Sequence, residues 1–93
     1  MANFHVGSTI ICSIEVRKAG ALYSPATSMN IIIDRTYPNY TTVVSSTGMT
    51  PGTTGKYSYN YNTSSAVTGE YLIKYIATDG AVISKSQDTF ILV

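Results

Sequence analysis

Residues 68–80, TGEYLIKYIATDG, carry the clearest secondary-structure signal in this chain of 93 residues. Apolar or aromatic side chains occupy alternate positions along it, at Tyr71, Ile73, Tyr75 and Ala77. Successive side chains of a β-strand point to opposite faces, so such a stretch has one apolar face. It ends at Asp79-Gly80, a dipeptide typical of the turns between antiparallel strands. The stretch therefore predicts a long half-buried strand followed by a tight turn.

The same alternation recurs on both sides of this stretch. Further strands are expected at residues 4–6, 8–17, 28–36, 41–46, 56–62 and 89–92. Their apolar faces are expected to carry Ile10, Cys12, Ile14 and Val16, then Met29, Ile31 and Ile33, and then Tyr57, Tyr59 and Tyr61. Proline and glycine predict a turn at residues 37–40 and a loop at 47–55. About seven short strands of this kind predict an all-β chain, with two antiparallel sheets packed face to face as a β-sandwich.

Composition limits the domain count and the classes of partner. A chain of 93 residues is expected to form a single domain, 1–93, because a shorter unit would bury too little surface to hold a core. Hydrophobic residues make up 44% of the chain, and the formal net charge is only +1. That charge provides no field to attract nucleic acid or anionic lipid, so neither is an expected partner. Neither a signal peptide nor a membrane span is visible, although a piece cut from a longer secreted chain would look the same.

The second half of the chain resembles a known family. The segments GKYSYNYNTSSAVTGEYLIKYIATDG (residues 55–80) and DTFILV (residues 88–93) resemble immunoglobulin-like domains of bacterial surface proteins and of tailed-phage virion proteins. The likeness covers about residues 7–93, since VGSTIICSIEV also resembles their first long strand. It implies an immunoglobulin-like β-sandwich of about seven antiparallel strands in two sheets. The paired cysteines and the tryptophan of antibody-type domains are missing, which argues against an antibody-like or receptor-like role.

Two residues are expected to have structural roles. Tyr71 follows Gly69 at the start of its strand, as the tyrosine of a tyrosine corner does. Its ring is expected in the core, with the hydroxyl bonded to backbone at the neighbouring crossover. Cys12 is the only cysteine and lies between Ile10 and Ile14, so it is expected to be buried and unreactive.

For the other candidate residues, a structural role is favoured over catalysis or ligand binding. The row Tyr57, Tyr59 and Tyr61 is expected to face the core, although a stacking platform for sugars or a protein stays open. His5 is expected at the surface, since no Ser-His-Asp set can be traced. For Asp34, Asp79 and Asp88, solvated turn positions are expected rather than a calcium site. No catalytic residue, metal ligand or cofactor-binding residue is therefore predicted.

Two functions from different classes remain open. The first is a non-enzymatic structural protein of a tailed-phage virion, assembled in the host cytoplasm, which decorates the capsid or lies at the head or the head-to-tail junction. Its partners would be other virion proteins or copies of itself, met through edge strands, loops and termini. The expected interaction surface is formed by Phe90, Ile91, Val93, Tyr37 and Tyr40. The alternative is an extracellular or cell-surface binding module of a bacterial adhesin or carbohydrate-active enzyme, which recognises glycan or protein.

Overall fold

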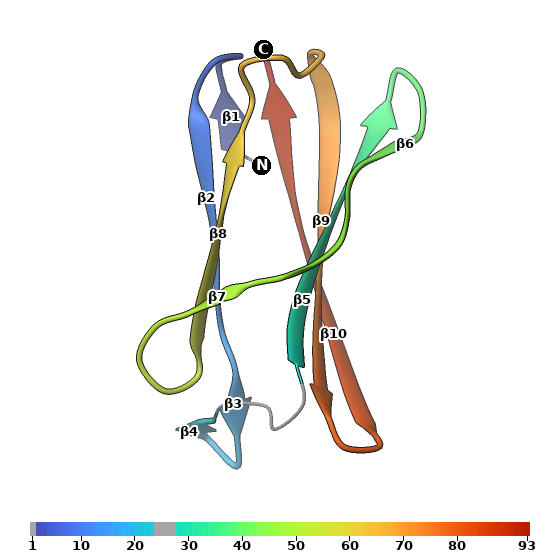
Figure 1. Cartoon of the computed structure of the whole chain (residues 1–93). Coiled ribbons are helices and arrows are strands. Elements are labelled where there is room, and N and C mark those ends of the chain that lie inside the picture. The colour runs from blue at the N-terminus through green and yellow to red at the C-terminus, as the bar shows by residue number, and fades with distance from the viewer. Residues whose placement is uncertain (1, 24–27) are drawn as a thin grey trace.

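A computed structural model describes residues 2–23 and 28–93, and within these residues the chain forms strands and no helix (Figure 1). The strands are β1 (Ala2–Phe4), β2 (Thr9–Glu15), β3 (Arg17–Lys18), β4 (Ala21–Leu22), β5 (Ser28–Tyr37), β6 (Thr41–Gly48), β7 (Thr50–Pro51), β8 (Lys56–Asn62), β9 (Gly69–Asp79) and β10 (Val82–Leu92). The prediction of an all-β chain is confirmed. The expected count of about seven is wrong, because three additional two-residue strands form: β3 at the end of the strand predicted at residues 8–17, and β4 and β7 in stretches without a strand signal.

The described strands form two facing sheets and one small ribbon. The larger sheet has five strands in the order β1-β10-β9-β5-β6, and the smaller has three in the order β2-β8-β7. Strands β3 and β4 pair only with each other. Neighbours are antiparallel except β1, which runs parallel to β10, so the expectation of purely antiparallel sheets is wrong at this edge. The two larger sheets have the arrangement of a β-sandwich.

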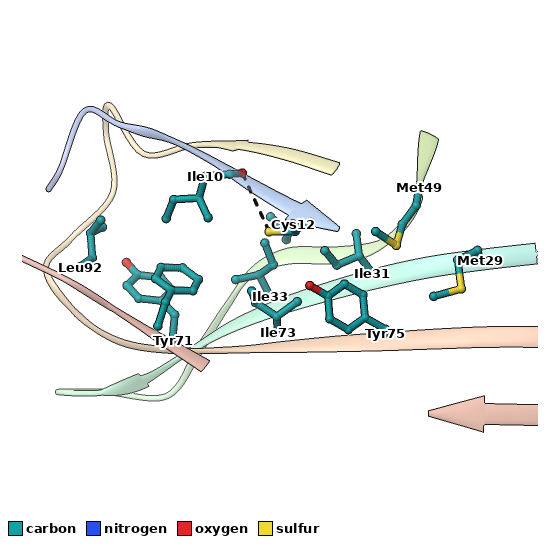
Figure 2. Packing of buried hydrophobic residues seen from close by; sticks show 12 residues of the cluster. Ile10, Cys12, Met29, Ile31, Ile33, Met49, Tyr71, Ile73, Tyr75 and Leu92 are labelled. Carbon is teal, nitrogen blue, oxygen red and sulfur yellow. Dashed lines mark hydrogen bonds between the residues drawn. The ribbon is translucent and has the colours of Figure 1, made fainter. Parts of the chain in front are cut away.

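The core lies between the two sheets and follows the alternation of the sequence (Figure 2). Strand β9 buries Tyr71, Ile73 and Tyr75, and β5 buries Met29, Ile31 and Ile33. Strand β2 of the facing sheet buries Ile10 and Cys12. The half-buried Tyr57, Tyr59 and Tyr61 of β8 pack against this cluster, as the core-facing interpretation predicted.

The loop predicted at residues 47–55 is partly wrong. Met49 is buried in the core, and β7 directly after it pairs with β8 of the smaller sheet. The chain therefore crosses from the five-stranded to the three-stranded sheet at this point (Figure 1). Pro51 is compatible with β7 because a strand at the edge of a sheet does not need every N–H group for pairing.

Tyr71 has the environment expected of a tyrosine corner. Its side chain is buried, and its hydroxyl donates a hydrogen bond to the backbone carbonyl of Val67. Its ring stacks on that of Phe90, with 4.9 Å between centroids and 5° between planes. The phenol therefore fills the end of the core while its polar atom keeps a partner at the β8–β9 crossover.

Replacing Tyr71 by phenylalanine is expected to lower the free energy of unfolding by about 1 kcal/mol, because the Val67 carbonyl loses a donor. The matched control is Tyr37→Phe, since Tyr37 is exposed, and surface changes away from structural contacts stay within about 0.5 kcal/mol. Urea denaturation of the three proteins measures both effects. Equal midpoints for Tyr71→Phe and the wild type would contradict the role given to this hydroxyl.

Candidate functional site

The residues predicted to form an interaction surface divide between the surface and the core. Tyr37 and Tyr40 are each 63% exposed; Tyr37 is the last residue of β5, and Tyr40 lies in the β5–β6 turn, directly before β6. Val93 is also exposed. Ile91 is half-buried on the outer face of the five-stranded sheet, the face turned away from β2 and β8.

The prediction that Phe90 belongs to the interaction surface is wrong. It is 2% exposed, because its ring points inward, stacks on Tyr71 and meets Phe4 edge to face. Ile91, next along β10, points outward instead. Strand pairing brings Ile91 opposite Glu70, and Glu70 opposite Tyr37, so three neighbouring strands carry these residues in one row. The remaining contact candidates therefore lie near one end of the outer face, without Phe90.

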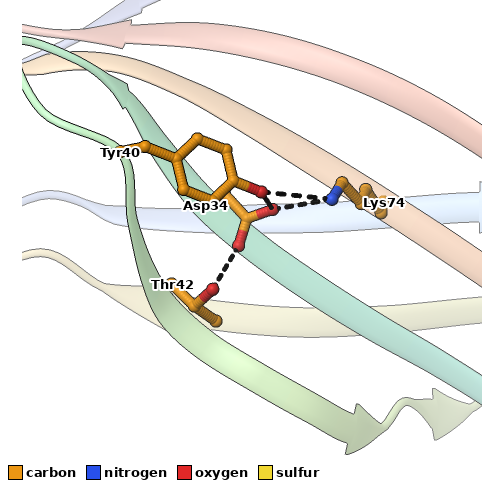
Figure 3. Close-up of polar contacts among 4 residues, drawn as sticks. All are labelled: Asp34, Tyr40, Thr42 and Lys74. Carbon is orange, nitrogen blue, oxygen red and sulfur yellow. Dashed lines mark hydrogen bonds and ion pairs between the residues drawn. The ribbon is translucent and has the colours of Figure 1, made fainter.

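A polar cluster lies beside this end of the outer face (Figure 3). The Asp34 carboxylate is 1% exposed and forms an ion pair with Lys74, with 2.9 Å between Oδ2 and Nζ. The Tyr40 hydroxyl donates to the same Oδ2 at 2.6 Å, and the Thr42 hydroxyl donates to Oδ1 at 2.8 Å. Lys74 also donates to the Tyr40 hydroxyl oxygen, at 3.4 Å. The expectation that Asp34 is a solvated turn residue is therefore wrong.

The electrostatics of the cluster keep both members of the pair charged. Burial alone would raise the pKa of Asp34, but the hydrogen bonds from Tyr40, Lys74 and Thr42 outweigh burial and lower it. The hydrogen bond to Asp34 in turn raises the pKa of Lys74. At neutral pH the cluster is therefore a carboxylate that accepts bonds from an ammonium group and two hydroxyl groups.

The cluster has a consequence for Tyr40. Its ring lies exposed on the outer face, yet its hydroxyl is fixed to a buried carboxylate and to Lys74. Around it, alternation along β5 and β9 places three half-buried aliphatic side chains on the same face: Ile32, Leu72 and Ile76. We call these five residues (Ile32, Tyr40, Leu72, Lys74 and Ile76) the outer patch. It combines a fixed aromatic ring, aliphatic surface and one cation.

The outer patch was only partly visible in the sequence. Tyr40 was a candidate, but its link to Asp34 and Lys74 was missed. A signal was present, because Lys74 interrupts the otherwise apolar run from Tyr71 to Ala77 and Asp34 directly follows three isoleucines. Two opposite charges in such apolar surroundings favour a mutual ion pair over two separate solvated groups.

The remaining candidates are distributed over separate places. Among the residues that the structure describes, no group of three or more His, Cys, Asp or Glu side chains is arranged to hold a metal ion. Asp79 accepts a hydrogen bond from the Tyr23 hydroxyl at 2.6 Å, Asp88 is exposed on β10, and His5 is exposed after β1. Cys12 is buried, as predicted, and burial raises the pKa of its thiol to about 11. A thiol of that pKa is almost entirely protonated at neutral pH.

Comparisons with known proteins gave no family: no family model, curated protein or solved structure matches the chain. In residues 2–23 and 28–93, no helix has the length and apolar character needed to span a membrane. The geometry of the outer patch and the sequence resemblance are therefore the two features of the chain that bear on its function.

Proposed function

We propose that the chain is a non-enzymatic structural protein of a tailed-phage virion, built as an immunoglobulin-like β-sandwich and acting through protein–protein contacts. The order of the strands supports the immunoglobulin-like part of this proposal. Immunoglobulin domains carry strands C, F and G in one sheet and B, E and D in the other. Here β5, β9 and β10 are neighbours in one sheet, and β2, β8 and β7 are neighbours in the other, in the corresponding sequence order. The virion part is supported by the sequence resemblance.

The main observation in favour of a protein-contact function is that hydrogen bonds hold the exposed side chain of Tyr40 in place. A side chain that is free in solution loses conformational entropy when a partner immobilises it. The Tyr40 hydroxyl already donates to Asp34 and accepts from Lys74, so a partner gains the aromatic contact at a reduced entropic cost. Tyrosine is among the residues enriched in protein interfaces and in their energetic hot spots. The aliphatic residues of the outer patch add apolar surface around it.

The alternative, a glycan-binding module of an adhesin or carbohydrate-active enzyme, has weaker support. Its best sequence feature was the row Tyr57, Tyr59 and Tyr61, which packs against the core and is only partly accessible. A stacking platform needs ring faces open to solvent. On the outer patch a single tyrosine is surrounded by aliphatic side chains, a composition closer to that of a protein contact.

Truncation of Tyr40 is expected to weaken binding to the virion. Tyr40→Ala should raise the Kd for purified particles, or for one of their proteins, by about thirtyfold, as loss of a hot-spot side chain does. Tyr40→Phe keeps the ring but releases it from Asp34, and should raise the Kd by about fivefold. The control is Ile11→Ala, because Ile11 is 68% exposed on the outer face of the other sheet. Co-sedimentation or interferometry with particles and isolated capsid and tail proteins measures these constants.

A panel of glycans, tested with the same proteins, separates the two functions. The proposal expects no glycan to bind with an affinity that depends on Tyr40. A chain that binds a glycan tightly and ignores every capsid and tail protein of its own genome would overturn the virion proposal in favour of the adhesin. Equal weakening by Tyr40→Ala and Ile11→Ala would instead remove the outer patch as the contact.

A further inference from the structure

Strand β10 has one edge that is largely unpaired in the part of the chain that the structure describes. Strand β9 pairs with β10 along its whole length, whereas β1 covers the opposite edge only at Phe90, Ile91 and Leu92. The pairing with β9 continues without a register shift from Val82 to Leu92. Residues Val82 to Thr89 are all exposed. Within residues 2–23 and 28–93, this edge is therefore a row of backbone groups without a neighbouring strand.

The hydrogen bonds to β1 show which backbone groups point to the open edge. Val93 donates to Phe4 and accepts from Val6, so its backbone faces the β1 side. Backbone groups in an antiparallel pair alternate in direction along the strand. Those of Ile83, Lys85 and Gln87 therefore face the open edge. Thr89 faces it too, but its N–H already donates to the Asp88 carboxylate, at 2.8 Å. The row of backbone groups open to a partner therefore ends before Thr89.

A groove runs beside this edge, between β10 and β2. Ser84, Ser86 and Asp88 share the inner face with the buried residues of β9, yet they are exposed, so no described residue covers this part of the inner face. Three adjoining depressions of about 190, 190 and 170 Å³ follow one another along it. Their apolar lining includes Ile10, Cys12 and Ile14 of β2, Val16 directly after it, and Tyr75 and Ala77 of β9.

The charges along the groove differ between its ends. Lys18 and Lys85 lie towards the beginning of β10, and neither pairs with a carboxylate within the described residues. Glu15 and Arg17 neutralise each other there, at 2.9 Å. Asp88 lies at the other end, among the residues of the third depression. A segment that fills the groove is therefore favoured by an acidic group near Lys85 and a basic group near Asp88.

We propose that this groove binds an extended segment of a partner protein, which adds a strand to β10 at Ile83 to Gln87. The segment would have apolar side chains at alternate positions, because one side of an added strand faces the three depressions and the other faces solvent. It would carry an acidic residue at the Lys85 end and a basic residue at the Asp88 end. Backbone hydrogen bonds supply the affinity and the depressions supply the selectivity. The inference does not depend on the virion proposal, since the outer patch lies on another face.

Two synthetic peptides test the proposal with labelled-peptide anisotropy. One has lysine, then alternating valine and threonine, then glutamate, and the other has the two charged residues exchanged. The first matches an antiparallel added strand and the second a parallel one, so one of them is expected to bind. N-methylation of its backbone at alternate residues should abolish binding, because the methylated positions lose their hydrogen-bond donors.

Variants of β10 identify the binding edge. Gln87→Pro removes an N–H that faces the open edge and keeps the bonds to β9, so the affinity for the peptide should fall at least about tenfold. Gln87→Ala keeps that N–H and should bind as the wild type does. Ser86→Phe fills the inner side of the groove and should weaken binding similarly. Circular dichroism confirms that each variant is folded, and Tyr40→Ala should leave peptide binding unchanged.

Three results would overturn the proposal. The first is no binding of either peptide to the wild-type chain. The second is equal binding to Gln87→Pro and Gln87→Ala, which would place the peptide elsewhere. The third is a wild-type dimer, measured by sedimentation, that Gln87→Pro converts to a monomer, because the occupant of the edge would then be a second copy of the chain.

Discussion

Replacing Gly69 by alanine is expected to lower the free energy of unfolding by about 3 to 5 kcal/mol. Gly69 has a φ of +151°, which side-chain-bearing residues rarely adopt, and a Cβ there would clash with the backbone carbonyl oxygen of Tyr37. Backbone strain and overpacking therefore act together, each worth about 1 to 3 kcal/mol. The carbonyl belongs to the end of β5, so relief requires β5 and β9 to separate beside Tyr71. Urea denaturation measures the loss.

The matched control for Gly69 is Gly80→Ala. Gly80 also has a positive φ, of +61°, but a Cβ there would meet no heavy atom within 4 Å. In this variant only the backbone conformation is unfavourable, so the free energy of unfolding should fall by about 1 kcal/mol. Equal losses at the two positions would show that the close approach of Tyr37 has no energetic consequence.

Replacing Asp34 by alanine is expected to cost about 3 kcal/mol of stability. The change leaves Lys74 without its carboxylate and removes the acceptor for the hydroxyls of Tyr40 and Thr42. Removing one partner of a buried ion pair typically costs about 3 to 5 kcal/mol. Because Lys74 is partly exposed, we expect a loss at the lower end of this range. Asp34→Asn keeps an acceptor and should lose less. A double-mutant cycle with Lys74→Met isolates the coupling between the two charges.

The stability from Asp34 should also depend on pH. The folded chain lowers the pKa of Asp34 below that of the unfolded chain, which is about 3.9. The ion pair therefore stabilises fully at pH values above the unfolded pKa and loses this effect as the pH falls through the folded value. The difference in stability between wild type and Asp34→Asn should shrink below about pH 4. A difference independent of pH would contradict the charged state assigned to Asp34.

Alternation predicted those parts of the fold that depend on local pattern. The inward faces of β2, β5 and β9 follow directly from the period of two in their sequences. The backbone bond of Tyr71 was also predictable, because a glycine two residues earlier marks the start of its strand. In each case the signal lies within a few residues of the position that it describes.

The features that were not predicted depend on contacts between segments that are far apart in the sequence. Asp34 and Lys74 are forty positions apart, and only the pairing of β5 with β9 brings them together. Met49 enters the core from a stretch rich in glycine and threonine, which has no alternation to mark a strand. For Phe90 the alternation with Ile91 was visible, but it could not say which residue faces inward.

The central claim, that the outer patch contacts another protein, is tested most directly by photo-crosslinking at Tyr40. A benzoyl-phenylalanine incorporated in place of Tyr40 should, on illumination with assembling or purified particles, form one covalent product with a virion protein. The same group in place of Ile11, equally exposed on the opposite sheet, should form none. Products of similar yield from both positions, or a product from position 11 alone, would contradict the claim.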